Sequence, residues 1–148
     1  MKKVFAMLLI LTMGFGLVSC SSDDDSVSGP QFTIVGTWKV TQIFINNVEA
    51  NVDDYCPYNG TFQFINGGTY VENGYEMEMV NLDCIPLDVV GGNWAKNNNS
   101  YTLTLNGGET STVLPSTFTP IIDSDNINKF ELSLSAGGIP TRLVFTKQ

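Results

Sequence analysis

The stretch Thr61-Phe62-Gln63-Phe64-Ile65-Asn66-Gly67-Gly68-Thr69-Tyr70-Val71 encodes a β-hairpin. Apolar and polar residues alternate across 61–65, which is typical of a strand with one buried face. Asn66-Gly67-Gly68 then supplies residues that readily adopt positive φ, as tight hairpin turns require. The sequence therefore predicts two antiparallel strands, over 61–65 and 69–71, joined by a short turn.

The rest of the chain from residue 31 onward repeats this pattern of short runs broken by Gly, Asn, Asp and Pro. No stretch keeps a helical apolar period over a dozen residues, so helix is expected to be minor. Further strands are predicted over 34–45, 76–80, 92–96, 101–105, 110–114, 118–122, 129–134 and 142–145. Pro115 and Pro120 should occupy edge or bulged positions, because proline cannot donate a ladder hydrogen bond. The predicted fold class is all-β, an antiparallel up-and-down β-barrel of about eight strands with little helix.

Length and composition limit the functions that such a domain can carry. The chain has 148 residues, a formal net charge of −8 and no histidine. The length suits one folded domain, and the lack of histidine removes Ser-His-Asp triads, Cys-His pairs and imidazole metal ligands. The acidic balance argues against nucleic acid as a partner, because phosphate backbones are bound by clustered Lys and Arg. No enzymatic activity, cofactor or metal is predicted.

The N-terminus is typical of an export signal. Met1-Lys2-Lys3 is basic, and the apolar run that follows is too short to span a bilayer comfortably. Leu17-Val18-Ser19-Cys20 resembles the lipobox of bacterial lipoproteins, in which the cysteine is lipidated and becomes the mature N-terminus. An ordinary signal peptide with an incidental cysteine is the alternative. The resemblance implies a signal peptide over 1–19 and a membrane anchor at Cys20.

A polar segment, residues 20–31, links the predicted anchor to the predicted barrel domain, residues 32–148. It is acidic and has no aromatic residue, as a flexible tether does. Its run Asp23-Asp24-Asp25 also resembles the surface-export signal of lipoproteins in some two-membrane bacteria, although a solvated Ser/Asp linker has the same composition. The predicted location is the outer membrane, with the domain facing the cell exterior.

Cys56 and Cys84 remain after the lipidation site is set aside. In an oxidising compartment two thiols are more often bridged than free. Two thiolates without histidine leave a metal site incomplete, and a catalytic dithiol is normally spaced as C-x-x-C. A structural disulfide is predicted, and closing the loop from 56 to 84 should stabilise the fold by about 3–4 kcal/mol on the loop-entropy model.

The carboxylates show no spacing that singles out a catalytic pair. We expect them on solvated faces and in turns: Asp53, Asp54, Glu72, Glu76, Glu78, Asp83, Asp88, Asp123 and Asp125. Asp123-Ser124-Asp125-Asn126 lacks the glycine and the distant glutamate of a calcium loop, which favours an Asx turn.

Several signals, in this order, resemble the small lipocalin-like lipoproteins of two-membrane bacteria. They are Gly36-Thr37-Trp38, Cys56, the Phe62/Phe64 strand, Asn66-Gly67-Gly68-Thr69-Tyr70, Cys84, Gly92-Asn93-Trp94 and Tyr101-Thr102-Leu103-Thr104-Leu105. The resemblance covers residues 32–147 and implies a barrel in which Trp38 packs across the closed end. The body is short for a full-length lipocalin and shows no C-terminal helix, which leaves the size of a ligand cavity open.

This resemblance implies a binding module for a small apolar or amphiphilic molecule at the open end of the barrel. The candidate ligand-binding residues, which could equally be core, are Trp38, Phe44, Phe62, Phe64, Tyr70, Trp94, Tyr101 and Phe130. The remaining inward positions are predicted to be Val40, Gln42, Leu103, Leu105, Leu132, Leu134, Leu143 and Phe145. The alternative is a filled barrel, a structural or interaction lipoprotein that contacts a protein or glycan partner.

In either case the segment 73–90 is long enough to carry function, with Met77 and Met79 as half-buried strand residues or as an adaptable lip. Ligand identity and oligomeric state are left open.

Overall fold

Strands and single turns of 3₁₀ helix make up the part of the chain that the computed structural model describes, residues 31–148. The strands are β1 (Gly36–Ile45), β2 (Val48–Ala50), β3 (Thr61–Ile65), β4 (Thr69–Asn73), β5 (Tyr75–Met77), β6 (Cys84–Pro86), β7 (Val90–Asn97), β8 (Ser100–Leu105), β9 (Thr117–Phe118), β10 (Ile121–Ile122), β11 (Lys129–Ala136) and β12 (Ile139–Lys147). The 3₁₀ turns are η1 (Val52–Asp54), η2 (Cys56–Asn59) and η3 (Asn106–Gly108). The predicted signal peptide, the predicted lipidation site Cys20 and residues 20–30 of the predicted tether lie outside the described residues. None of the helices within 31–148 has the length and apolarity needed to cross a membrane.

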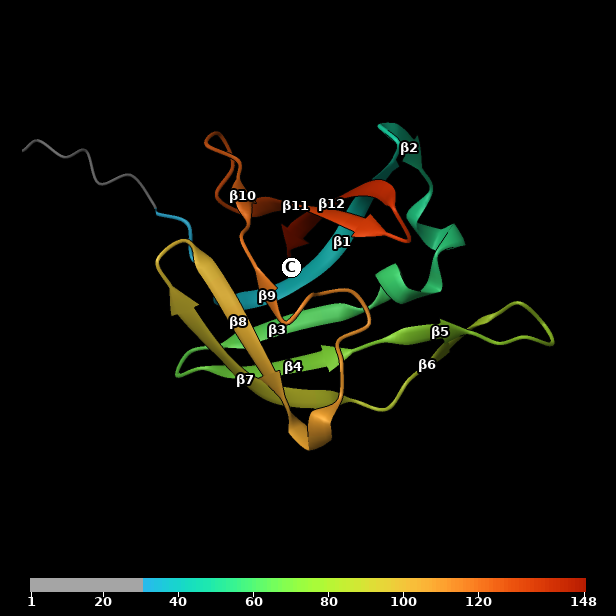
Figure 1. Cartoon of the computed structure of the whole chain (residues 1–148), viewed down its shortest axis with the longest axis horizontal. Helices are drawn as coiled ribbons and strands as arrows, with labels where there is room; N and C mark the ends of the chain where they lie inside the picture. The colour runs from blue at the N-terminus through green and yellow to red at the C-terminus, as the bar shows by residue number, and fades with distance from the viewer. Residues whose placement is uncertain (1–30) are drawn as a thin grey trace, which may run out of the picture.

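The main sheet follows the order of the chain and curls strongly. Its strand order is β10-β11-β12-β1-β3-β4-β7-β8-β9, with antiparallel pairing throughout. The two edge strands, β9 and β10, are consecutive in the chain, and only Thr119 and Pro120 separate them. One broken strand therefore pairs with β8 on one side and with β11 on the other, which joins the curled sheet back to itself (Figure 1). Counted as one strand, β9 and β10 bring the barrel to about the eight strands predicted, and the fold class is confirmed.

The two ends of the barrel differ (Figure 1). Short turns at 66–68, 98–99 and 123–128 gather at one end, on the left of the view, where the described chain also enters the barrel; we call it the turn end. Longer connections gather at the other end, on the right, and we call it the loop end. The loop end carries β2, η1, η2, the separate β5–β6 hairpin and the residues that follow η3.

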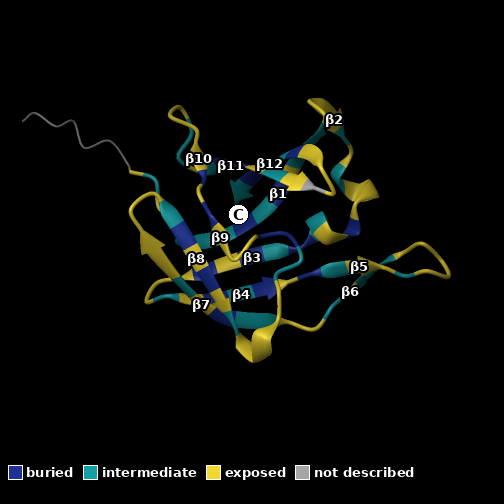
Figure 2. Cartoon of the chain, viewed as in Figure 1, coloured by how far each residue is buried: buried dark blue, intermediate teal, exposed yellow. Residues whose placement is uncertain are grey.

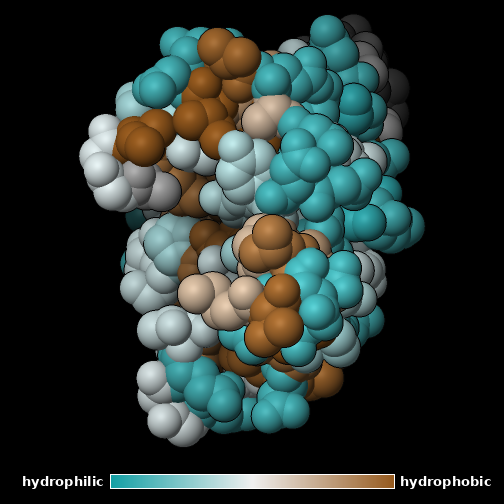
Figure 3. Space-filling view, turned by 90° about the vertical axis from the view of Figure 1, so that its right-hand side faces the viewer, coloured by the Kyte–Doolittle hydropathy of each residue, from teal (hydrophilic) through white to brown (hydrophobic). Residues whose placement is uncertain are grey.

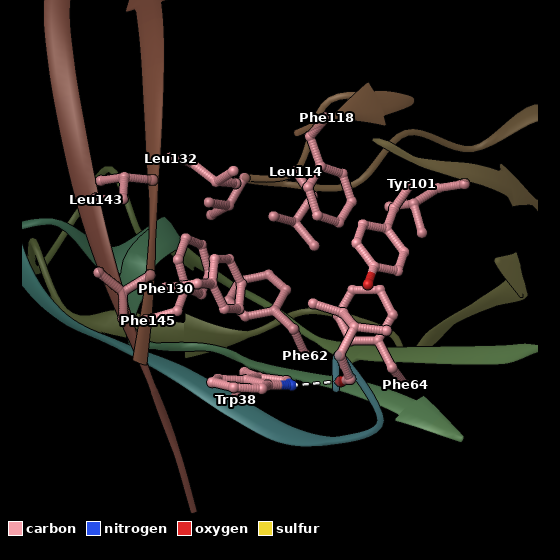
Figure 4. Packing of buried hydrophobic residues seen from close by; sticks show 14 of the residues in the cluster. Trp38, Phe62, Phe64, Tyr101, Leu114, Phe118, Phe130, Leu132, Leu143 and Phe145 are labelled. Atoms are coloured by element: carbon pink, nitrogen blue, oxygen red, sulfur yellow. Dashed lines mark hydrogen bonds between the residues drawn. The ribbon is translucent and has the colours of Figure 1, made fainter. Parts of the chain in front are cut away.

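Aromatic side chains fill the interior of the barrel (Figure 4). Trp38 is fully buried, with its ring centroid 4.8 Å from that of Phe130, which stacks in turn on Phe145 at 4.6 Å. The indole N–H of Trp38 donates to the carbonyl of Ile34 at 2.6 Å, which fixes the entering chain at the turn end. The inner faces of the strands are buried and their outer faces exposed (Figure 2), as alternating strands around one core require. The interior is therefore a packed core, with its open space at the barrel's ends and outer face.

A β-bulge in β1 reverses the side-chain parity that the sequence suggests. Val40 lies opposite Phe145 and Gln42 opposite Val144, so Thr41 is the extra residue. Beyond the bulge Ile43 points inward and is fully buried. The prediction that Phe44 and Gln42 point inward is therefore wrong. Phe44 lies outside, beneath the guanidinium of Arg142 at 3.8 Å from its ring centroid, and Gln42 donates to Glu49.

Three predicted strands differ from the structure. The strand predicted over 76–80 ends at Met77, because Leu82 N–H donates to the Glu78 carbonyl and closes a turn. Met79 is consequently 89 % exposed rather than half-buried. The strand predicted over 110–114 is absent, since side chains bind this segment's backbone amides, as described below. The strand predicted over 118–122 is split at Pro120, which confirms the irregular position expected of that proline.

Candidate functional site at the loop end

The segment Glu109–Ser116, which we call the strap, runs from η3 to β9 across the loop end of the barrel (Figure 1). The hydroxyl of Ser111 accepts hydrogen bonds from the backbone amides of Val113 (3.3 Å) and Leu114 (2.9 Å), which bends the chain away from strand geometry. Val113 and Leu114 point into the core and are buried, and Leu114 lies near Phe118 in Figure 4. The strap thus closes the interior with apolar side chains of its own.

A buried carboxylate holds the strap in place. Glu72 lies on β4, two residues after Tyr70 and on the same inward face, and it is fully buried. Its Oε1 accepts from the backbone N–H of Thr112 at 2.8 Å and from the Thr112 hydroxyl, while its Oε2 accepts from the Tyr70 hydroxyl at 2.7 Å. The prediction that Glu72 lies on a solvated surface is wrong, because these donors replace the water that the carboxylate loses on burial.

Tyr70 acts as a fixed donor to this carboxylate. Burial, together with the neighbouring Glu72 carboxylate, raises the pKa of the Tyr70 phenol far above its usual range. The phenol therefore keeps its proton throughout the physiological range and donates to Glu72. Its ring centroid lies 5.2 Å from that of Phe64, so the pair Tyr70–Glu72 forms a polar boundary between the aromatic core and the strap.

Two pockets flank the strap. One, of about 270 Å³, is bordered by strands and strap together: Leu103, Leu105, Glu109, Thr110, Ser111, Leu114, Pro115 and Ser116. The other, of about 430 Å³, lies on the opposite side and is lined by Tyr58, Ser111, Thr112, Val113, Leu114, Pro115, Leu134 and Ser135. Both include Ser111, Leu114 and Pro115, so the strap is the wall between them. Glu72 lines neither pocket and lies beneath Thr112, which borders the second one.

Most predicted ligand-binding residues lie in the core rather than at these pockets. Trp38, Phe62, Phe64, Tyr70, Tyr101 and Phe130 are buried, and only Tyr101 borders a described pocket, one of about 260 Å³ with Phe32 at the turn end. Trp94 is half-buried, with its indole N–H donating to the Ile65 carbonyl at 3.0 Å. Phe44 lies outside the barrel, as described above, where it borders a small pocket of about 120 Å³ with Arg142. The predicted inward residues Leu103, Leu105 and Leu134 do line the pockets beside the strap.

The segment 73–90 forms a hairpin apart from the barrel. Cys56 and Cys84 are bonded, with their Cα atoms 5.2 Å apart, which confirms the predicted disulfide and fastens the β5–β6 hairpin to η2. The hairpin tip exposes Met77, Met79, Val80 and Leu82. In Figure 3, which faces the loop end, hydrophobic patches interrupt a largely hydrophilic surface. The described residues contain no group of three or more carboxylate or cysteine side chains placed to hold a metal ion.

Comparison with known proteins gives the family. A model of the lipocalin-like domain matches residues 34–133. Similar solved structures include a lipocalin-like protein from Bacteroides uniformis ATCC 8492, at 14% identity and a TM-score of 0.46, covering 77% of this chain and 97% of that one. An uncharacterized protein from Bacteroides eggerthii DSM 20697 matches at 13% identity and a TM-score of 0.43, covering 77% of this chain and 98% of that one. No curated protein matches this sequence. Because the family model spans most of the described barrel, from β1 into β11, this chain belongs to the lipocalin-like domain family.

Proposed function

We propose that this protein is a lipid-anchored envelope protein, without catalytic activity, whose barrel binds a small apolar or amphiphilic molecule at the loop end. The observation that carries the proposal is the strap, which places Leu114 in the mouth of the core between two pockets. Apolar walls from Leu103 and Leu105 with a few polar groups beside them are the usual composition of a small-molecule site.

The packed core supports a site at the mouth of the barrel rather than at its centre. Trp38, Phe130 and Phe145 occupy the central volume in ring-to-ring contact. A ligand therefore takes the space beside the strap, and a larger ligand takes the space of Leu114 itself when the strap moves. The middle of the strap is held to β4 through Glu72, and its last residue is held to β8, where the Ser116 carbonyl accepts from the Leu103 N–H at 2.8 Å. Motion confined to the residues around Thr112 breaks the two hydrogen bonds to Glu72 and leaves the contact with β8 intact.

Native mass spectrometry of residues 21–148, purified from cells of the source type, tests the binding function. We expect a discrete additional mass that organic extraction removes while the circular dichroism spectrum of the protein is kept. The substitution Leu114→Trp should fill the shared wall and prevent the additional mass, whereas Val48→Trp, on an exposed residue of β2, should leave it unchanged. If the protein has the mass of the polypeptide alone before extraction, the result contradicts the proposal.

The anchor is proposed from Cys20, and the outer-membrane, outward-facing location from the acidic residues that follow it. The described chain enters the barrel at the turn end, which supports an arrangement with the loop end directed away from the membrane. We expect a clickable palmitate analogue fed to cells to label the protein, and Cys20→Ala to abolish the label while Cys56→Ala retains it. Protease added to intact cells should degrade the labelled protein. Label that persists in Cys20→Ala, or complete protection from the protease, would contradict the anchor or the orientation respectively.

A second candidate function is contact with a protein partner through the β5–β6 hairpin. Its tip exposes Met79 by 89 % and Val80 by 83 %, side chains that are seldom left together in water without a role. If the barrel carries no ligand, this hairpin is the surface to examine first.

A further inference from the structure

We propose that Glu72 recognises the head group of the ligand, and that the site selects amphiphiles carrying a protonated amine. This inference rests on the proposed function and adds the chemical class of the molecule that the loop end binds.

The first argument is the position of the carboxylate. Among the described residues Glu72 is the one charged side chain in the fully buried set, and it lies directly beneath Thr112, which lines the pocket of about 430 Å³. Both hydrogen bonds that the strap makes to Glu72 come from Thr112, one from its amide and one from its hydroxyl. When the strap moves, Oε1 loses both donors and Oε2 keeps Tyr70.

The second argument is the balance of donors. A buried carboxylate accepts hydrogen bonds only, and losing its donors costs the full desolvation of a charge. A primary ammonium group has three N–H donors and a positive charge, so it replaces the amide and hydroxyl of Thr112 and adds a charge pair. A hydroxyl head group returns one donor and no charge, and a carboxylate head group returns none. Displacement of the strap is therefore compensated best by an amine.

The third argument is the electric charge of the loop end. Residues 40–95, which include β2, η1, η2 and the β5–β6 hairpin, contain no Lys or Arg, and the strap contributes Glu109. Lys96, Lys129 and Lys147 lie where β7, β11 and β12 meet the turn end, and Arg142 is paired with Glu131 at 2.8 Å. The remaining cation of the described residues, Lys39 on β1, borders a separate pocket that it shares with the carboxylates Glu49 and Asp53. The potential at the loop end is consequently negative, which attracts a cationic amphiphile and repels a fatty-acid anion.

The fourth argument is space for a tail. Leu103, Leu105, Leu114 and Pro115 border the pocket of about 270 Å³ on the other side of the strap. An alkyl chain lying against these side chains places its head group at Thr112 and Glu72, since the strap alone separates the two pockets.

The test compares three probes that share one tail: dodecylamine, dodecanol and dodecanoate, each below its micelle concentration, bound to residues 21–148 at pH 7 by calorimetry. We expect dodecylamine to bind about tenfold or more tightly than dodecanol, since a hydrogen bond to a charged group contributes about 1.5–3 kcal/mol. Dodecanoate should bind more weakly than dodecanol.

Two substitutions should shift the preference in opposite directions. Glu72→Gln should remove the advantage of the amine over the alcohol. Thr112→Val keeps the carboxylate but removes a competing donor, so it should tighten dodecylamine binding several-fold. Glu76→Gln removes one carboxylate from the β5–β6 hairpin, away from the pockets, and should leave the ratio of the two affinities unchanged. If Glu72→Gln does not fold, Thr112→Val decides alone.

The possible results distinguish a failure of the role inferred for Glu72 from a failure of the proposed ligand binding. Equal affinities for amine and alcohol, or a preference that survives Glu72→Gln, overturn the role of Glu72 and leave binding at the loop end standing. Looser dodecylamine binding in Thr112→Val overturns it as well. Failure of all three probes to bind, together with a bare mass by native mass spectrometry, overturns both proposals.

Discussion

Replacing Trp38 by alanine is expected to lower the free energy of unfolding by about 3–5 kcal/mol, the usual cost of removing a large aromatic side chain from a packed core. Trp38 is fully buried, and its ring lies 4.8 Å from Phe130 and 5.9 Å from Phe32 between centroids. The substitution also leaves the Ile34 carbonyl without its indole donor. The substitution should therefore destabilise both the barrel and the segment that enters it.

Urea unfolding followed by circular dichroism measures this loss, and Phe44→Ala is the matched control. Both residues lie on β1 and both are large aromatics, yet the bulge at Thr41 places Phe44 outside, against Arg142. A half-exposed contact of this kind is expected to contribute about 1 kcal/mol. Equal losses for the two variants would mean that Phe44 also lies in the core.

Removing the disulfide with the double substitution Cys56→Ser and Cys84→Ser is expected to cost about 3.5 kcal/mol. The two cysteines are 28 positions apart, and opening a loop of that length restores conformational entropy to the unfolded chain. In the native state the bond also fastens β6 to η2. The β5–β6 hairpin should consequently lose order before the barrel does.

Chemical denaturation of the double variant, beginning at residue 21 so that Cys20 is absent, measures the effect. Wild-type protein in a strong reductant should show the same midpoint as the variant, because both lack the same bond. Hydrogen exchange should increase first over 74–89. A double variant as stable as the oxidised wild type would show that the bond constrains neither state.

The hairpins of the barrel could be predicted because local chemistry determines them. Asn66-Gly67-Gly68 and the Asn-rich stretch before Ser100 leave little choice but a tight turn, and the flanking residues alternate with the strand period. Gly67 and Gly68 both adopt positive φ, as do Asn98, Asn46 and Asn47. These turns and the strands beside them lie where the sequence predicts.

The bulge at Thr41 could not be predicted in the same way. A strand that alternates without interruption would bury Phe44, and no residue in 36–45 marks the insertion of one extra position. The bulge is set by the pairing with β12, where Val40 and Gln42 face consecutive residues of the partner strand. The face of the sheet on which a side chain lies can be extrapolated along a strand only as far as the pairing register is regular.

The burial of Glu72 and the bend of the strap could not be predicted from the sequence, for a related reason. A glutamate within an alternating strand is normally solvated, and two of the three donors that permit its burial belong to Thr112, 40 positions further along the chain. The segment 110–114 has β-branched residues and alternation, yet Ser111 binds its own following amides and turns it into a bend. The candidate site thus depends on the contact between Glu72 and Thr112, which are too far apart in the sequence for local patterns to reveal it.

The pairing of the first barrel strand with the last has a consequence for when the domain can form during synthesis. Trp38 on β1 faces Lys147 at the far end of β12, and Phe130 must meet Phe145 before its ring is covered. A nascent chain that lacks β12 leaves β1 with an open edge and its aromatic residues in water. Contacts between such distant segments also form slowly. The domain therefore completes its folding only after β12 has emerged from the ribosome, so the first barrel strand waits for the last.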